Sequence, residues 1–350
     1  MSSGNPRSSP TAEPAIDAIL SAFETHALVG IGDYHGLAQQ AAFYADLVSD
    51  PRFARDVRNV VVEFGGAAAQ PIVDRFVAGE AVPYPELRRV WTDVVGWLPT
   101  VWSLSFMWFY AAVRAANLKL PPEQQIRVWL GEPPIDWSAI HTREDLYPLA
   151  ETRDSHPAEL IKQQILNKGE KAVVIYGYAH FQRAGFYVPQ NDTYVPTLLG
   201  LIEQDYPESL FLVVPYTGFT NKACIEKFEA LCGDWPTPAL VGPVKGTLLH
   251  DMLVDPEFKT FDQEPPGNEK LAEVQRCLTH TLNGATADAL LYLGPAMGLT
   301  FSAIDPQVYL DLDFLAEINR RVELYMPEQS FSYGDVIKDG TPLPQFIRPR

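Results

Sequence analysis

Largely apolar runs of five or six residues recur six times along this chain, with longer segments between them. Short runs without polar alternation are typical of strands that are buried on both faces of a sheet. The segments between the runs are long enough for helical crossovers, which favours parallel neighbours with right-handed connections. The sequence therefore predicts an α/β fold with a mostly parallel central sheet flanked by helices. The predicted strands are 27–31, 59–64, 126–130, 172–176, 210–214 and 289–293.

Helical spacing of apolar residues appears between these runs. It predicts helices over 37–48, over 68–78 with Gly79 as its stop, and over 155–167. From about 80 to 122 no strand pattern is present, and aromatic residues are frequent. We interpret this stretch as a helical insertion over the carboxyl edge of the sheet.

The length of 350 residues allows either two average domains or one large one. We predict a single α/β domain over 25–330. The Ser/Pro-rich residues 1–24 are predicted to be a disordered lead-in, and the aperiodic residues 331–350 a surface tail.

Charge and cysteine content limit the partners and the compartment. Forty-four acidic against 27 basic residues give a net charge of −17, which repels a nucleic-acid backbone. Three cysteines without metal-ligand spacing are typical of a reducing cytosol, and no secretory signal is expected. The uncharged stretch 94–113 is long enough to cross a bilayer, but its Gly, Pro and Ser content favours a buried helix. The chain is therefore predicted to be cytoplasmic, with no nucleic-acid or membrane partner.

Two four-residue patterns of the same type follow two of the predicted strands. Residues 32–35 read Gly-Asp-Tyr-His, and residues 177–180 read Gly-Tyr-Ala-His. Ligands bind at the carboxyl edge of open α/β sheets. His35 and His180 are therefore predicted to lie at such an edge, although either alone could be a hydrogen-bonded loop residue.

Two carboxylates follow the other strands in the same way. Glu63 comes directly after three valines, where an unpaired buried carboxylate would be costly. Glu132 follows the run 126–130 and precedes two prolines, so it is either a site residue or a solvated loop acid. Two imidazoles with one or two carboxylates suit either general acid/base catalysis on water or a divalent metal site formed by His35, Glu63 and His180.

Several nearby side chains are candidates for supporting roles. Asp33 and Tyr34 either orient His35 or cap the next helix, and Tyr178 belongs to the second pattern. Arg153 and Arg183 either bind an anionic group or pair with Glu63 or Glu132, and for Arg183 a surface charge is an equal alternative. The aromatic set of the insertion either packs in the core or forms a lid over an apolar ligand. Its members include Trp102, Phe106 and Phe109.

These residues resemble the superfamily of erythromycin-esterase-like enzymes, ChaN-type haem-binding proteins and TraB/GumN/Tiki proteins (the EreA/ChaN-like superfamily). The shared pattern is a Gly-Glu-x-His near the first strand, a Glu ending the second and a Gly-x-x-His ending a later one. Here it corresponds to residues 32–35 (with Asp33 in place of the Glu), Glu63 and residues 177–180. The resemblance covers roughly 25–215.

The resemblance implies a hydrolase acting on a small apolar or ester-type substrate. His35 would be the general base on water, Glu63 would orient it, and His180 would be the acid or electrophilic partner. The alternatives are a haem- or tetrapyrrole-binding protein and a non-catalytic ligand-binding protein. Cofactor, substrate and oligomeric state stay open, with a divalent metal ion or haem as the candidate cofactors.

Overall fold

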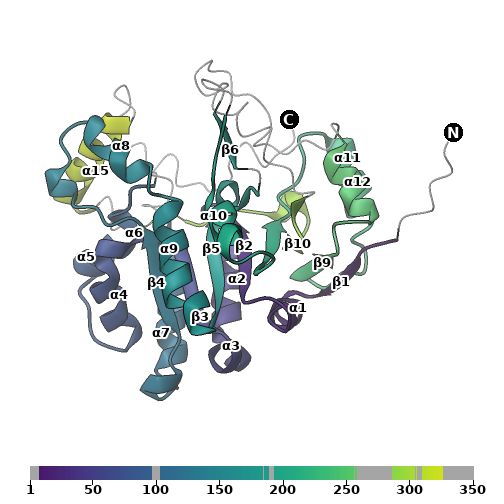
Figure 1. Ribbon diagram of the computed structural model, residues 1–350, viewed down its shortest axis with the longest axis horizontal. Helices are drawn as coiled ribbons and strands as arrows, with labels where there is room; N and C mark the ends of the chain where they lie inside the picture. Colours follow the sequence, from purple (N-terminus) through teal and green to yellow (C-terminus); the bar gives the residue numbers. More distant parts are fainter. Residues whose placement is uncertain are drawn as a thin grey trace. The chain divides into compact units, whose positions relative to one another are not determined.

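The computed structural model describes residues 8–96, 103–183, 185–188, 193–255, 257, 286–303, 305 and 310–325. It is an α/β fold with eight strands in a mostly parallel sheet flanked by helices, which confirms the predicted fold class (Figure 1). All six predicted strands are present. They are β2 (Leu28–Asp33), β3 (Arg58–Gly66), β4 (Arg127–Glu132), β5 (Lys171–Gly177), β8 (Leu210–Pro215) and β10 (Ala289–Tyr292).

The chain divides into two compact units, and each is described by itself. Among the described residues, unit 1 holds 8–34 and 161–299, and unit 2 holds 35–160 and 300–325. This division leaves the single domain over 25–330 a prediction.

Unit 1 contains six strands in the order β1-β9-β10-β8-β2-β5. The central strand β2 pairs in parallel with β5 and β8, and β10 pairs in parallel with β8. The strands β1 (Thr11–Pro14) and β9 (Ala239–Gly242) add an antiparallel edge. Outside the sheet, the chain also forms the hairpin β6 (Phe186–Val188) and β7 (Thr193–Val195) and the helices α10 (Leu198–Asp205), α11 (Lys222–Glu229) and α12 (Leu248–Val254).

The prediction that residues 1–24 form a disordered lead-in is wrong for residues 11–22. Residues Thr11–Pro14 form β1, whose backbone pairs with β9, and Ala15–Ala22 form helix α1. Ile19 is fully buried. An edge strand held by backbone hydrogen bonds leaves three of its four side chains exposed, so its composition resembles that of a solvated segment.

Unit 2 is built on the parallel pair β3 and β4. The predicted helices 37–48 and 68–78 are present as α2 (Ala38–Ser49) and as a short 3₁₀ turn followed by α4 (Gln70–Val77). Gly79 has φ +108°, a left-handed conformation that suits the residue after a helix. The other helices in the described residues of unit 2 are α3 (Pro51–Asp56), α5 (Tyr84–Leu87), α6 (Arg89–Thr92), α7 (Leu104–Asn117), α8 (Tyr147–Ala150) and α15 (Leu312–Tyr325). The predicted helix 155–167 is α9 (Ser155–Gln164) plus a 3₁₀ turn, and it passes from unit 2 into unit 1.

The aromatic residues of the insertion 80–122 form part of the core of unit 2. Phe64, at the end of β3, stacks on Phe106 with centroids 4.6 Å apart and meets Phe109 edge-on at 5.4 Å. Trp91 stacks on Tyr110, and all five rings are at most 4% exposed. Phe106 and Phe109 therefore match the core-packing alternative rather than the lid. Trp102 lies outside the described residues.

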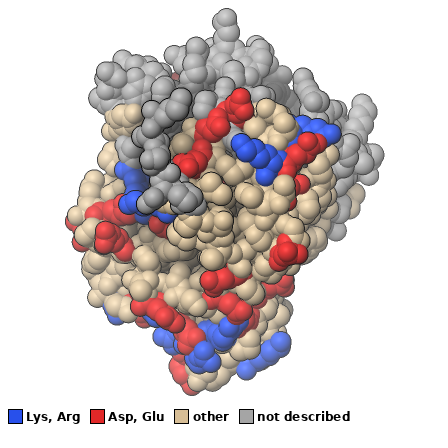
Figure 2. Space-filling model, turned by 90° about the vertical axis from the view of Figure 1, so that its right-hand side faces the viewer, with Lys and Arg blue, Asp and Glu red and all other residues tan. Residues whose placement is uncertain are grey.

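No helix in the described part of the chain is long and apolar enough to cross a membrane. On the face drawn in Figure 2, acidic and basic side chains are interspersed among uncharged residues. The predicted tail 331–350 lies outside the described residues.

Candidate functional site

Four ionisable side chains of unit 2 form a connected network. Arg153, in the turn before α9, donates from Nη2 to Glu63 Oε1 at 2.7 Å and from Nε to Glu132 Oε1 at 2.8 Å. The second oxygen of Glu63 lies 3.7 Å from Nε2 of His35, which comes two residues after β2 ends. Three residues predicted from separate strand ends, together with Arg153, thus lie in one cluster.

Exposure differs sharply within this network. The Glu63 and Glu132 side chains are only 6% and 1% exposed, whereas His35 is 32% and Arg153 25% exposed. Two buried carboxylates would be strongly unfavourable without a counter-charge. Arg153 supplies that charge to both, and the imidazole of His35 stays accessible to solvent.

Glu132 is held at both oxygens, which excludes the alternative of a solvated loop acid. Oε1 accepts from Arg153, and Oε2 accepts from the backbone N–H of Gly96 at 2.7 Å. Burial raises the pKa of Glu132, the Arg153 charge opposes the rise, and the nearby Glu63 carboxylate adds to it. A side chain at position 96 would place its Cβ 2.3 Å from Nη2 of Arg153, so any other residue there would displace the guanidinium from this position.

The network can act as a positioned base. A histidine beside a buried carboxylate is stabilised when it takes up a proton, and this is the pairing that general-base catalysis needs. The distance of 3.7 Å is that of an ion pair and is longer than a hydrogen bond.

The fit to a divalent metal ion is poor in this part of the molecule. The guanidinium of Arg153 already contacts Glu63 and Glu132 and competes with any cation for them. Within the residues that the structure describes, no three His, Cys, Asp or Glu side chains gather as a metal site. We therefore derive no step through a metal.

The two Gly-x-x-His patterns follow neighbouring parallel strands of unit 1. In the β2–β5 register Gly32 pairs with Tyr176 and Asp33 with Gly177. A Cβ on Gly32 would lie 3.3 Å from Cβ of Tyr178, so the glycine lets the second pattern pack closely against β2. His180 is 7% exposed and meets the ring of Tyr176 edge-on at 5.4 Å. Its membership of the site stays a prediction.

The other candidate residues have local partners. The Tyr178 hydroxyl lies 3.4 Å from Oγ1 of Thr286, and burial raises the pKa of Tyr178. Arg183 forms an ion pair with Glu203 at 3.0 Å and donates to the carbonyl of Thr286, which favours the surface-charge alternative. Asp33 and Tyr34 are partly buried at the end of β2.

A second cluster of charged groups surrounds a cavity of about 440 Å³ in unit 2. None of the residues predicted for the site lines it. Its walls come from α6, the loop after β4 and α15, a helix that the sequence patterns did not indicate. They include Arg89, Asp93, Trp137, Glu317, Arg320 and Arg321.

Comparisons with known proteins assign no family. No protein-family model matches the chain, and no curated protein matches it in sequence. The solved structures named here are remote likenesses. A toxin effector domain from Vibrio vulnificus, RRSP, has 19% identity and a TM-score of 0.37 over 58% of this chain and 36% of its own length. The type III effector HopBA1 has 12% identity and a TM-score of 0.34 over 59% of this chain and 87% of its own. A Bacillus cereus protein has 12% identity and a TM-score of 0.35 over 60% of this chain and 72% of its own length.

The chain thus spans about a third of the length of the toxin that it matches. Likenesses of this size assign neither a family nor an activity. The resemblance to the EreA/ChaN-like superfamily therefore stays a prediction.

Proposed function

We propose that the chain is a hydrolase in which His35 is the general base on water. One observation supports this most. His35 is accessible to solvent, and its Nε2 lies 3.7 Å from the buried carboxylate of Glu63, which Arg153 holds in place. A surface loop histidine would need neither the buried partner nor the arginine behind it.

In this proposal each residue of the network has a distinct role. His35 takes a proton from water as the nucleophile attacks, and the Glu63 carboxylate stabilises the imidazolium that forms. Arg153 fixes the Glu63 carboxylate and balances the charge of two buried acids. Glu132 in turn fixes Arg153.

The sequence patterns add further candidate residues to the proposal. His180 is the acid or electrophilic partner, and Asp33, Tyr34 and Tyr178 are supporting side chains. The resemblance to erythromycin-esterase-like enzymes gives His35, Glu63 and His180 the same roles. It suggests a small apolar or ester-type substrate.

The test is hydrolysis of a panel of p-nitrophenyl esters by the wild type and by His35→Ala. Loss of a positioned general base costs about 10²–10⁴-fold in rate. His141→Ala is the matched control, since His141 is an exposed imidazole whose removal reports nonspecific ester cleavage. Equal rates for all three proteins would contradict the proposal. If, in addition, titrated haem gave a Soret band that His35→Ala abolished, the tetrapyrrole-binding alternative would replace it.

A further inference from the structure

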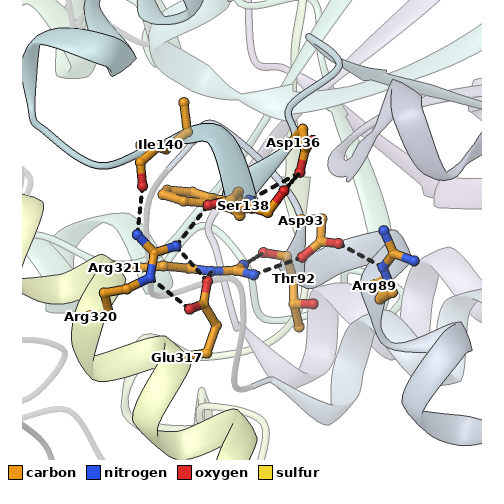
Figure 3. Close-up of polar contacts among 10 residues, drawn as sticks. Arg89, Thr92, Asp93, Asp136, Ser138, Ile140, Glu317, Arg320 and Arg321 are labelled. Atoms are coloured by element: carbon orange, nitrogen blue, oxygen red, sulfur yellow. Dashed lines mark hydrogen bonds and ion pairs between the residues drawn. The ribbon is translucent and has the colours of Figure 1, made fainter.

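A chain of contacts joins helix α15 to the proposed site. Arg321 of α15 donates from Nη1 to the carbonyl of Thr92 at 2.8 Å and from Nη2 to Oδ1 of Asp93 at 3.0 Å (Figure 3). Its side chain is 8% exposed. Arg321 therefore holds the residues at the end of α6 through both their backbone and a side chain.

The segment that follows these contacts is short and firmly packed. Val95 belongs to a buried cluster with Ile135, Trp137, Ile140 and Leu146. A Cβ on Gly66, at the end of β3, would lie 2.0 Å from the carbonyl oxygen of Asp93, so the strand and this segment touch through their backbones. At Gly96, one residue after Val95, the backbone N–H donates to the Glu132 carboxylate. Segment 92–96 thus has Arg321 at one end and Glu132 at the other.

Two more contacts fix Arg321 itself. Its Nε donates to Oε1 of Glu317 at 2.8 Å, one turn earlier on α15. Its guanidinium lies over the ring of Trp137, with the carbon 4.5 Å from the ring centroid. Asp93 is held from the other side as well, since its Oδ2 accepts from Arg89 at 2.9 Å. A buried arginine with this many fixed partners is a rigid support.

Glu132 depends on this support because, among the residues that the structure describes, two groups hold its carboxylate by hydrogen bonds. One is Arg153, which it helps to position, and the other is the Gly96 N–H. Loss of the Gly96 contact would leave a buried carboxylate attached to a partly exposed arginine. The arginine would then be free to draw Glu132 and Glu63 toward solvent.

We infer that Arg321 is a positioning residue for the site. Through segment 92–96 it fixes the position of the Gly96 N–H, which holds the Glu132 carboxylate. Through Glu132 it fixes the positions of Arg153 and Glu63. This inference rests on the proposed function for its meaning in catalysis, but the contacts it concerns can be measured without a substrate. It assigns α15, which lies outside the region of superfamily resemblance, a part in the proposed active site.

The experiment compares Arg321→Gln with Arg320→Gln. Arg320 is the neighbouring arginine on α15. It pairs with Glu317 and donates to the carbonyls of Trp137 and Ile140, and in the described part of the chain none of its hydrogen bonds goes to segment 92–96. The two readouts are hydrogen exchange of the Gly96 amide and the NMR signal of the Arg153 Nε–H. In Arg321→Gln we expect Gly96 to exchange about 10-fold faster or more and the Arg153 signal to shift or broaden. In Arg320→Gln both should match the wild type.

The inference fails if Arg321→Gln leaves both signals unchanged, or if Arg320→Gln alters them as much. Should Arg321→Gln not fold, Arg321→Lys decides. Lysine keeps the charge and one contact to Asp93 but cannot reach Thr92 and Glu317 as well, so an intermediate change at Gly96 is expected, and no change contradicts the inference. Ester hydrolysis is recorded in parallel. If His35→Ala retains full activity while Gly96 and Arg153 respond as described, the proposed function fails and the positioning role stands.

Discussion

At the residue scale, Glu63 links the charge of Arg153 to the imidazole of His35. Its two oxygens face these two groups, and the carboxylate is buried between them. Its two possible roles, structural ion-pair partner and catalytic orienter, are both compatible with these contacts. They differ in how stability and rate respond to removal of the charge.

Glu63→Gln keeps the shape of the side chain and removes its charge. In this variant Arg153 keeps its ion pair with Glu132, and its side chain is a quarter exposed to solvent. We therefore expect the free energy of unfolding to fall by only about 1–2 kcal/mol. Hydrolysis should fall far more than this loss of stability explains, because His35 loses its counter-charge. Glu226→Gln, which breaks an exposed Lys222 pair, is the control and should cost no more than about 0.5 kcal/mol. A large loss of stability with an unchanged rate per folded molecule would assign Glu63 a purely structural role.

Glu132 predicts a pH dependence of stability. Burial raises its pKa in the folded chain, so the folded chain keeps this proton to a higher pH than the unfolded chain does. Its contribution to stability is full below the unfolded value of about 4.5 and is lost as the pH rises through the raised value. Urea unfolding of the wild type and of Glu132→Gln over this range should show the wild type losing stability relative to the variant. If the difference in unfolding free energy between the two proteins did not change with pH, the raised pKa of Glu132 would be contradicted.

Much of the network could be predicted from single residues of the sequence. Glu63, Glu132 and His35 each follow an apolar run, and parallel strands bring such positions to one edge. Pairing with Glu63 or Glu132 was one of the two alternatives predicted for Arg153, beside binding of an anionic group. The supports at Gly96 and Arg321 were not predicted, since hydrogen bonds from a backbone N–H and from a helix more than 200 residues along the chain leave no local pattern.

At the scale of elements, the buried strands were the clearest signal. Unbroken apolar runs gave β2, β3, β4, β5, β8 and β10 because both faces of these strands are covered. The edge strand β1, its neighbour β9 and helix α15 escaped prediction for a common physical reason. They are short or partly exposed, and their positions depend on pairing with distant segments.

Gly66 tests whether close backbone packing at the end of β3 holds segment 92–96. Its φ of −79° is open to any residue, so the effect of a side chain is purely steric. In Gly66→Ala the new Cβ would meet the Asp93 carbonyl, and we expect a loss of about 1–3 kcal/mol in unfolding free energy. Gly233→Ala, where no atom lies within 4 Å of the added Cβ, is the control. Equal stability of the two variants, measured by urea unfolding, would show that segment 92–96 can move away from the new Cβ with no loss of unfolding free energy.

At the scale of the whole molecule, we expect the chain to unfold as one domain. Two compact units share the described residues, but the chain passes between them repeatedly, at 34–35, at 160–161 and at 299–300. Units connected in this way rarely fold independently. Far-UV circular dichroism and tryptophan fluorescence should give one coincident transition in urea. Trp235 belongs to unit 1 and Trp129 to unit 2, so single-tryptophan variants at these positions would reveal two separate transitions if the units were independent domains.

The central claim is that His35 is a base held by a buried carboxylate network. The most direct measurement is chemical rescue of His35→Ala by free imidazole, with the p-nitrophenyl ester that the wild type hydrolyses best as the probe. The account predicts that the variant keeps the wild-type melting temperature, loses about 10²–10⁴-fold in rate and regains part of it as imidazole saturates the position left by the side chain. The same imidazole should add only its uncatalysed rate to Glu63→Gln. A His35→Ala protein as active as the wild type, or one whose rate rises with imidazole no faster than the solution reaction, would contradict the account.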